Sequence, residues 1–216
     1  KFPAMVAAPR PSRPATVLLT GFDAFGGGVL NPSWEAARAL HRRQIAGHRV
    51  QAAQLPTAFG AALARLDELL AAHRPALVVC LGLAAGRAAL SLERVAINVD
   101  DASIADNAGA RPIDVPVVAG APAAYFSTLP IKAMRQAMGA AGVPAEVSQT
   151  AGTFVCNHVF YGLMHRLATV RRLARTRGGF VHVPLLLAQG APSLPLEAMV
   201  EGLRVGSRTA LTTTHD

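Results

Sequence analysis

One cysteine of this sequence stands where a thiol could act as a nucleophile. Cys156 lies in the segment AGTFVCNH, residues 151–158, where small residues lead into a run with helical periodicity. At the first turn of a helix, backbone N–H groups and the helix dipole favour the thiolate, and the same groups can stabilise an oxyanion. The pattern predicts a nucleophile with a lowered pKa, although a buried cysteine that only packs as a small apolar residue would look the same locally. Cys80, inside an unbroken apolar run, is expected to lie in the core.

A cysteine nucleophile requires a base, and His182 has the most suitable surroundings. It stands in GGFVHVP, residues 178–184, a short apolar strand that ends at a proline. Its imidazole is therefore either a satisfied core group or a base that faces a cleft at the strand end. His158 is the rival, but two positions after Cys156 on a helix it points to a different face. The remaining histidines lie mostly in polar helices or at the tail: His41, His48, His73, His165 and His215.

A third group would fix the imidazole tautomer and stabilise the imidazolium, and a carboxylate does this in other catalytic triads. Glu93 is flanked by apolar residues in SLERVAIN, residues 91–98, and a part-buried carboxylate there needs a partner. That partner is either the histidine or a nearby arginine such as Arg87 or Arg94. The polar segment that follows supplies the alternative carboxylates Asp100, Asp101 and Asp106.

Neither a metal ion nor an organic cofactor is expected. No two of the histidine, cysteine and carboxylate residues fall at a recognised metal-ligand spacing. The glycine run at residues 26–28 lacks the spacing of a phosphate-binding loop.

The chemistry requires a scaffold, and the apolar periodicity predicts strands that alternate with helices. Asn31 and Pro32 are suited to begin one helix, and Thr57 to cap the next. Residues 100–114 are polar and are expected to form a long functional loop. Strands are expected at 16–20, 49–55, 77–81, 145–148 and 180–183, with an extended segment at 90–99; helices are expected at 32–45, 57–73, 131–138, 156–167 and 196–208. This alternation predicts an α/β sandwich with a largely parallel sheet.

Length and composition favour one compact unit. The chain has 216 residues, of which 51% are hydrophobic and 16% charged, enough for one large core. Residues 16–216 are expected to form a single domain. Residues 1–15, rich in proline, are set aside as an N-terminal extension that is disordered or was added for expression.

The charge and the cysteines limit the partners. The net charge of +8 comes almost wholly from scattered arginines without a nucleic-acid recognition motif, so a solvated basic surface is expected rather than a nucleic-acid site. No segment is long enough to span a membrane. Two cysteines are no disulfide framework, and a reducing, cytoplasmic location suits them better.

Several motifs, in order, make the chain from about Val17 to Leu203 resemble the pyroglutamyl peptidase I family, the pyrrolidone-carboxylate peptidases. The motifs are TGFDAFGG at 20–27 with Asn31-Pro32, ERVAIN at 93–98, Asp106-Asn107, AYFSTLPIK at 124–132, GTFVCNH at 152–158 and GFVHVP at 179–184. Such a series of independent matches is highly specific.

The resemblance implies a three-layer α/β/α sandwich with a largely parallel, mixed, twisted sheet. It implies a cysteine peptidase that removes an N-terminal pyroglutamyl residue from peptides through a thioester, with Cys156, His182 and Glu93 as its triad. The family's pocket implies that Phe22 and Phe25 sandwich the lactam ring, and that the wall is completed by Thr57, Ile104, Phe154 and Val155. Family members commonly form homotetramers, so a homo-oligomer, tetramer or dimer, is expected.

The chain departs from the family pattern in two places. Ser103 and Ala105 stand where the family usually has arginine and proline, and residues 184–189 read PLLLAQ in place of Pro-Tyr-x-Pro-Glu-Gln. The alternatives that these departures favour are a thiol amidohydrolase or acyltransferase of altered specificity, and a catalytically silent homologue that serves as a binding module.

Overall fold

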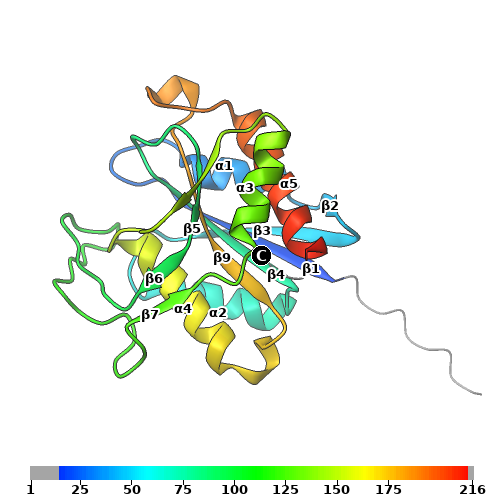
Figure 1. Ribbon diagram of the computed structural model, residues 1–216. Coiled ribbons are helices and arrows are strands. Elements are labelled where there is room, and N and C mark those ends of the chain that lie inside the picture. Colours follow the sequence, from blue (N-terminus) through cyan, green and yellow to red (C-terminus); the bar gives the residue numbers. More distant parts are fainter. Residues whose placement is uncertain (1–14, 214–216) are drawn as a thin grey trace, which may run out of the picture.

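The computed structural model describes residues 15–213, arranged around one large sheet (Figure 1). The expected N-terminal extension, apart from Ala15, and His215 lie outside the described residues. The strands are β1 (Thr16–Phe22), β2 (Gln44–Ile45), β3 (His48–Leu55), β4 (Leu77–Leu83), β5 (Leu90–Glu93), β6 (Val95–Ile97), β7 (Ala124–Phe126), β8 (Ala145–Ser148) and β9 (Arg177–Val183). The helices are α1 (Pro32–Ala39), α2 (Ala61–His73), α3 (Ile131–Ala140), α4 (Val155–Thr169) and α5 (Leu196–Thr212), with short 3-10 helices η1 (Arg171–Leu173) and η2 (Leu187–Gln189).

The main sheet has seven strands in the order β2-β3-β1-β4-β9-β5-β8. The central strands β3, β1, β4 and β9 run parallel to one another, whereas β5 runs antiparallel to β9 and β2 antiparallel to β3. Strands β1, β4 and β9 are buried almost throughout, as strands covered on both faces must be. The sheet is thus mixed and largely parallel, as predicted.

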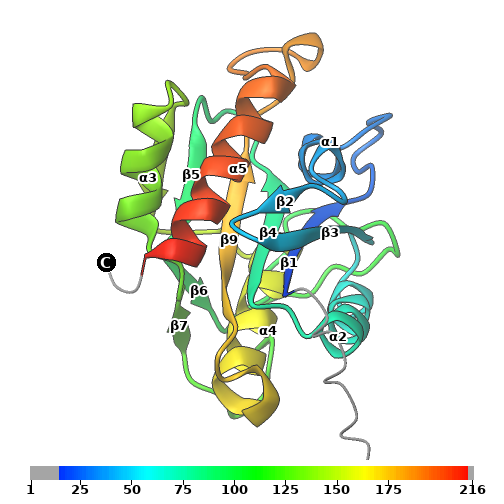
Figure 2. The same cartoon turned by 90° about the vertical axis from the view of Figure 1, so that its right-hand side faces the viewer.

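Helices cover both faces of the sheet and make a three-layer α/β/α sandwich. One apolar cluster joins α1, α3 and α5 to the sheet through residues such as Ala37, Met134 and Leu203. The other joins α2 and α4 to the opposite face through residues such as Leu66 and Phe160. In Figure 2, α3 and α5 lie over the near face of the sheet, and α4 emerges from behind the strands.

Tertiary contacts, rather than local propensity, set several element boundaries. The first helix was expected to include Ile45, but α1 ends at Ala39 and Ile45 forms part of β2. The extended segment 90–99 divides at Arg94 into β5, in the main sheet, and β6, which pairs with β7 in a separate two-stranded ribbon beside α4 (Figure 1).

The predicted cap of the second helix was wrong. Helix α2 begins at Ala61 after Gly60, which has no side chain to cap it, and Thr57 lies four residues before the first helical position. The backbone N–H of Thr57 instead donates to Asp23 Oδ1 at 2.7 Å. Asn31, in contrast, caps α1 as expected, because its side chain accepts from the Ser33 N–H at 3.1 Å.

Candidate active site

His182 and Glu93 meet where two antiparallel strands lie side by side. In the β5–β9 pairing, Ser91 is opposite His182, so Glu93 lies two positions further along β5 on the same face. The His182 Nδ1 and Glu93 Oε1 atoms are 2.8 Å apart, and the Glu93 side chain has no solvent exposure. A carboxylate can only accept, so Nδ1 carries the proton and donates it, which leaves Nε2 free to act as a base.

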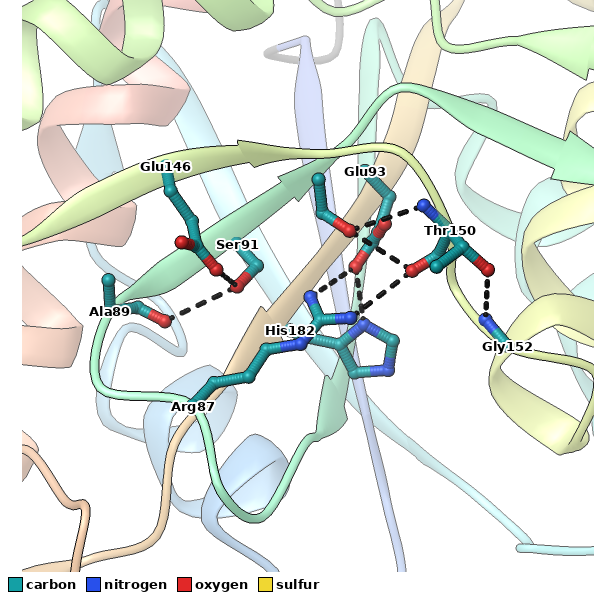
Figure 3. Close-up of polar contacts among 9 residues, drawn as sticks. Arg87, Ala89, Ser91, Glu93, Glu146, Thr150, Gly152 and His182 are labelled. Atoms are coloured by element: carbon teal, nitrogen blue, oxygen red, sulfur yellow. Dashed lines mark hydrogen bonds and ion pairs between the residues drawn. The ribbon is translucent and has the colours of Figure 1, made fainter.

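Glu93 also forms an ion pair with Arg87, which lies in the turn between β4 and β5. Arg87 Nη1 donates to the same oxygen, Oε1, at 2.7 Å, and Nη2 donates to the Thr150 carbonyl at 3.2 Å (Figure 3). The two partners considered for Glu93, a histidine and an arginine, therefore both occur. Arg94 is not the partner, because its Nε atom donates to Gln149 Oε1 at 2.9 Å.

Cys156 is the second residue of α4, and its sulfur lies against the end of β4. A Cβ atom added to Gly82 would stand 2.7 Å from Cys156 Sγ, so the sulfur takes the space that a side chain at position 82 would need. Gly82 is opposite His182 in the β4–β9 pairing. The thiol and the imidazole therefore lie together at the carboxyl ends of two neighbouring parallel strands, where open α/β sheets place their ligands.

The start of α4 offers backbone donors beside the sulfur. Phe154 precedes the helix in an extended conformation and makes no side-chain capping hydrogen bond. The N–H groups of the first helical turn have no partner within the helix, so they can receive an oxyanion that forms next to Cys156.

Burial is the largest influence on the pKa of Cys156 and on that of His182. Burial raises the pKa of the Cys156 thiol to about 12, and the Glu93 charge adds to this while Arg87 opposes it. Burial also lowers the pKa of His182 below its usual 6.5, against the opposing hydrogen bond from Glu93. Desolvation therefore favours the uncharged form of both groups. The prediction of a lowered thiol pKa was wrong, because burial is the largest influence on the thiol.

A small apolar cavity of about 140 Å³ opens next to Cys156. Its lining residues are Phe22, Phe25, Leu30, Asn31, Thr57, Leu83, Phe154, Val155 and Cys156. Five of the six residues expected to form a lactam pocket are among them. Ile104 is not, and its side chain in the 100–114 loop is 53% exposed.

The cavity is lined without any charged side chain. Its polar side chains are already engaged, since Asn31 Nδ2 donates to the Asp23 carbonyl at 2.9 Å and Thr57 Oγ1 to the same oxygen at 3.4 Å. The Phe25 and Phe154 rings lie 5.3 Å apart between centroids. A flat, uncharged group suits this space, whereas a charged group would find no partner.

Three lining residues were not expected in the pocket. Leu30 and Leu83 are apolar residues beside a glycine-rich loop and a strand end, and only the fold brings them together. Asn31 was expected as a helix cap, which it is, in addition to lining the cavity. The position of Leu83 directly after Gly82, at the end of an apolar strand, was the one available signal.

The 100–114 segment is an irregular loop tied to the walls of the cavity. The Asp106 Oδ2 atom accepts from the Phe59 N–H at 2.7 Å, and the Asn107 N–H donates to the Thr57 carbonyl at 3.0 Å. The Asp101 N–H donates to the Thr153 carbonyl at 3.0 Å, which links the loop to the approach to Cys156. These bonds form in a loop that carries Ser103 and Ala105, the two positions that depart from the expected pattern.

His158, the rival base, is held in a separate contact. Its Nδ1 atom lies 2.7 Å from Asp100 Oδ2, and its Nε2 atom accepts from the Gly60 N–H at 3.0 Å. Both ring nitrogens are therefore occupied. As the helical spacing predicts, His158 does not face the same way as Cys156.

Both cysteines are free thiols, and Cys80 is fully buried in β4. Within residues 15–213, no group of three or more His, Cys, Asp and Glu side chains is arranged to hold a metal ion. In the same range, no helix has the length and apolar character needed to cross a lipid bilayer.

Comparison with known proteins gives consistent matches along nearly the whole chain. Residues 15–213 match the family model described as pyroglutamyl peptidase. A pyrrolidone-carboxylate peptidase of Cupriavidus taiwanensis is 62% identical over 207 residues, which covers 93% of this chain and 95% of the relative. One from Bacillus cytotoxicus is 50% identical over 206 residues, with the same coverage.

Solved structures agree with the sequence relatives. The pyroglutamyl peptidase I of Bacillus amyloliquefaciens superposes with a TM-score of 0.91 at 43% identity, covering 94% of this chain and 98% of the other. A mutant pyrrolidone carboxyl peptidase of Pyrococcus furiosus gives a TM-score of 0.85 at 38% identity, covering 91% and 98%.

Proposed function

The chain belongs to the pyroglutamyl peptidase family of cysteine peptidases, and from this premise we propose that it hydrolyses the amide bond after an N-terminal pyroglutamyl residue, with Cys156 as nucleophile, His182 as base and Glu93 as the group that orients the base. The observation that carries the proposal is the junction at the carboxyl ends of β4 and β9. There a cysteine at a helix start, a histidine–carboxylate pair and a small uncharged cavity adjoin one another.

The first half of the reaction forms a thioester. His182 Nε2 takes the Sγ proton as the sulfur attacks the pyroglutamyl carbonyl carbon, and the carbonyl π electrons move to the oxygen. The N–H groups at the start of α4 hold this oxyanion, while the Glu93 carboxylate stabilises the imidazolium. The intermediate then collapses: the C–N bond breaks, and His182 returns its proton to the departing amine.

The second half regenerates the enzyme. A water molecule loses a proton to His182 Nε2 and attacks the thioester carbonyl, and the C–S bond breaks. The sulfur regains the proton from His182, and free pyroglutamate leaves. Because desolvation favours the neutral thiol, His182 must accept the Sγ proton for the attack to occur.

The cavity accounts for the choice of substrate. The lactam is small, planar and uncharged, so the rings of Phe22 and Phe25 and nearby backbone groups can enclose it. An ordinary N-terminal residue carries an α-ammonium, and no charged side chain in the cavity would compensate its desolvation. Thr57, Phe154 and Val155 complete the proposed pocket, while Ile104 would contact substrate only from the exposed loop.

The test is release of fluorophore from a pyroglutamyl-aminocoumarin substrate under reducing conditions. Wild-type protein is expected to release it, whereas Cys156→Ala and His182→Ala lose at least about 10³-fold in kcat. A prolyl substrate that lacks the lactam carbonyl is the specificity control. Wild-type turnover by Cys156→Ala, or equal turnover of the prolyl substrate, would contradict the proposal.

We also propose that residues 16–216 work as a single peptidase domain in a reducing cytoplasm, as a homo-oligomer that binds neither nucleic acid nor membrane. Two unpaired thiols, one of them the nucleophile, support a reducing location. Exposed apolar side chains such as Ile113 and Phe126, 75% and 71% exposed, support a subunit contact. Light scattering during size-exclusion chromatography measures the oligomeric state, and a monomer at micromolar concentration would contradict that part.

A further inference from the structure

Glu93 has an unusual position for a carboxylate. Its side chain is completely buried, and a single oxygen, Oε1, accepts both from His182 and from Arg87. The other oxygen, Oε2, is buried and has no hydrogen-bond partner among the described residues. A buried carboxylate with only a neutral imidazole as partner is costly to keep charged, so the guanidinium is the group that compensates the charge.

Arg87 also connects two parts of the site. Its Nη1 atom holds Glu93 on β5 at 2.7 Å, and its Nη2 atom holds the Thr150 carbonyl at 3.2 Å, in the segment that leads to Cys156 (Figure 3). Its side chain is 26% exposed and comes from the turn after β4, outside the cavity. It therefore reaches the histidine only through Glu93, and it does not line the space where the lactam would bind.

On the basis of the peptidase mechanism above, we propose that Arg87 is a positioning residue for catalysis. Its charge compensates the buried Glu93 side chain and keeps His182 a neutral base down to lower pH, while its second guanidinium N–H group fixes the segment before Cys156. It acts on the rate of the chemical step and leaves lactam binding nearly unchanged.

The electrostatics of the pair agree with this geometry. The Arg87 charge is one of the influences that lower the pKa of His182, and it also opposes the rise in the pKa of Cys156. Removing the charge should therefore move both groups in the same direction, toward higher pKa. The base would become protonated, and hence inactive, at a higher pH than in the wild type.

Few other charged or titratable groups face His182. Glu93 approaches from β5, Arg87 from the turn before it and Cys156 from α4. One strand further out, Glu146 on β8 accepts from Ser91 Oγ at 2.7 Å (Figure 3). Arg87 is the one cation among these groups, so none of the others can replace its positive charge.

The experiment compares four proteins: wild type, Arg87→Gln, Arg87→Lys and Arg94→Gln. Glutamine removes the charge but keeps a hydrogen-bonding amide, and lysine keeps the charge. Arg94→Gln is the matched control, because it removes the same charge from the residue next to Glu93 without touching that carboxylate. Melting temperatures establish that each variant is folded.

The first readout is the pH dependence of kcat/KM for pyroglutamyl-aminocoumarin. In Arg87→Gln the acidic limb of the kcat/KM profile should move to higher pH by about one unit. At neutral pH, kcat should fall about tenfold, while KM should change by less than about twofold. Arg87→Lys and Arg94→Gln should keep the wild-type limb. The proposal would be overturned if the acidic limb of Arg87→Gln stayed at the wild-type pH, or if that of Arg94→Gln shifted by the same amount.

The second readout does not depend on the substrate. The rate at which iodoacetamide alkylates Cys156, measured across pH by mass spectrometry of the peptide, should shift to higher pH in Arg87→Gln only. If wild-type protein proved inactive on the lactam substrate, the proposed function would fail while this shift still upheld the role of Arg87. An unshifted alkylation profile in Arg87→Gln counts against that role whatever the substrate.

Discussion

At the scale of single residues, Glu93 acts through its charge as well as its shape. It accepts the Nδ1–H of His182 at 2.8 Å from a site without solvent, where the field of a carboxylate is poorly screened. The same field opposes thiolate formation at Cys156 and favours the imidazolium. Glu93 therefore disfavours a thiolate at Cys156 before substrate is attacked, and it favours transfer of the thiol proton to His182.

Glu93→Gln should separate these effects. The amide oxygen can still accept from His182, but the charge that stabilises the imidazolium is gone. We expect kcat to fall by about 10²- to 10⁴-fold with little change in KM, measured with the aminocoumarin substrate. Glu146→Gln, which alters a carboxylate one strand away, is the control and should keep wild-type kcat. An equal loss of kcat in both variants would contradict a specific role for the Glu93 charge.

The pH profile of the wild type follows from the buried imidazole. Burial holds the pKa of His182 below 6.5, so the base is neutral at pH 7 and is lost by protonation only as the pH falls through that lowered pKa. The acidic limb of kcat/KM should therefore lie below pH 6.5. With the pKa of Cys156 at about 12, the thiol itself adds no loss of activity near neutral pH. A midpoint above 7 in stopped or continuous assays would contradict this reading.

The sequence nominated each member of the proposed triad but did not show how they meet. Glu93 and His182 are separated by 89 positions, and only the antiparallel pairing of β5 with β9 joins them. The direction of the thiol pKa shift was missed for the same reason. A helix start is visible in the residue order, whereas the desolvation of a cysteine depends on what the rest of the fold packs around it.

At the scale of elements, His158 joins three segments around the cavity. It stands on α4, accepts from the Gly60 N–H before α2 and contacts Asp100 at the start of the long loop. Its ring also packs edge-on against Phe59, with centroids 5.3 Å apart, and Phe59 packs against Phe154 in the cavity wall. The shape of the cavity therefore depends on a residue that does not line it.

His158→Asn should weaken substrate binding more than chemistry. Asparagine is too short to hold Gly60 and Asp100 together, which leaves a buried carboxylate or N–H without its partner. We expect KM to rise several-fold with kcat nearly kept, and the free energy of unfolding to fall by about 1–3 kcal/mol in urea titrations. His41→Asn is the control, since His41 also accepts a backbone N–H, that of Ala52 at 3.1 Å, but outside the site. A loss confined to kcat would refute this account.

The elements themselves were largely predictable, because β1 and β4 are nearly continuous apolar runs and the helices follow amphipathic spacing. The predicted boundaries were wrong where a hydrogen bond to a distant residue replaced a local one. Thr57 has the chemistry of a helix cap, but its N–H bonds to Asp23, 34 positions away, and α2 starts later. No window of neighbouring residues contains that information.

At the scale of the whole molecule, the layered fold divides the two thiols into an accessible one and a protected one. Cys80 has no exposed surface at the centre of the sheet, and burial raises its pKa to about 12. Cys156 is only partly enclosed and adjoins the cavity. Since the two thiols have similarly raised pKa values, the contrast in their reactivity should come from access rather than from acidity.

Titration with Ellman's reagent measures this directly. The native protein should react at one thiol per chain, and that reaction should disappear in Cys156→Ala. In denaturant both thiols should react, and Cys80 should become reactive in the native buffer only as fast as the sheet unfolds globally. Rapid reaction of both thiols in native protein would show that the core opens locally. Cys80→Ala serves as the second control.

The sulfur of Cys156 fills the space beside β4 where residue 82 has no side chain, and this limits which residues position 82 can accept. Every replacement of glycine by another amino acid adds at least a Cβ atom, which at position 82 would stand 2.7 Å from Sγ and 2.8 Å from the Phe180 ring. In a saturation library screened for activity, position 82 should therefore return glycine alone. A lineage could accept a larger residue there only after the nucleophile or the ring had moved, so these neighbouring positions are constrained to evolve together.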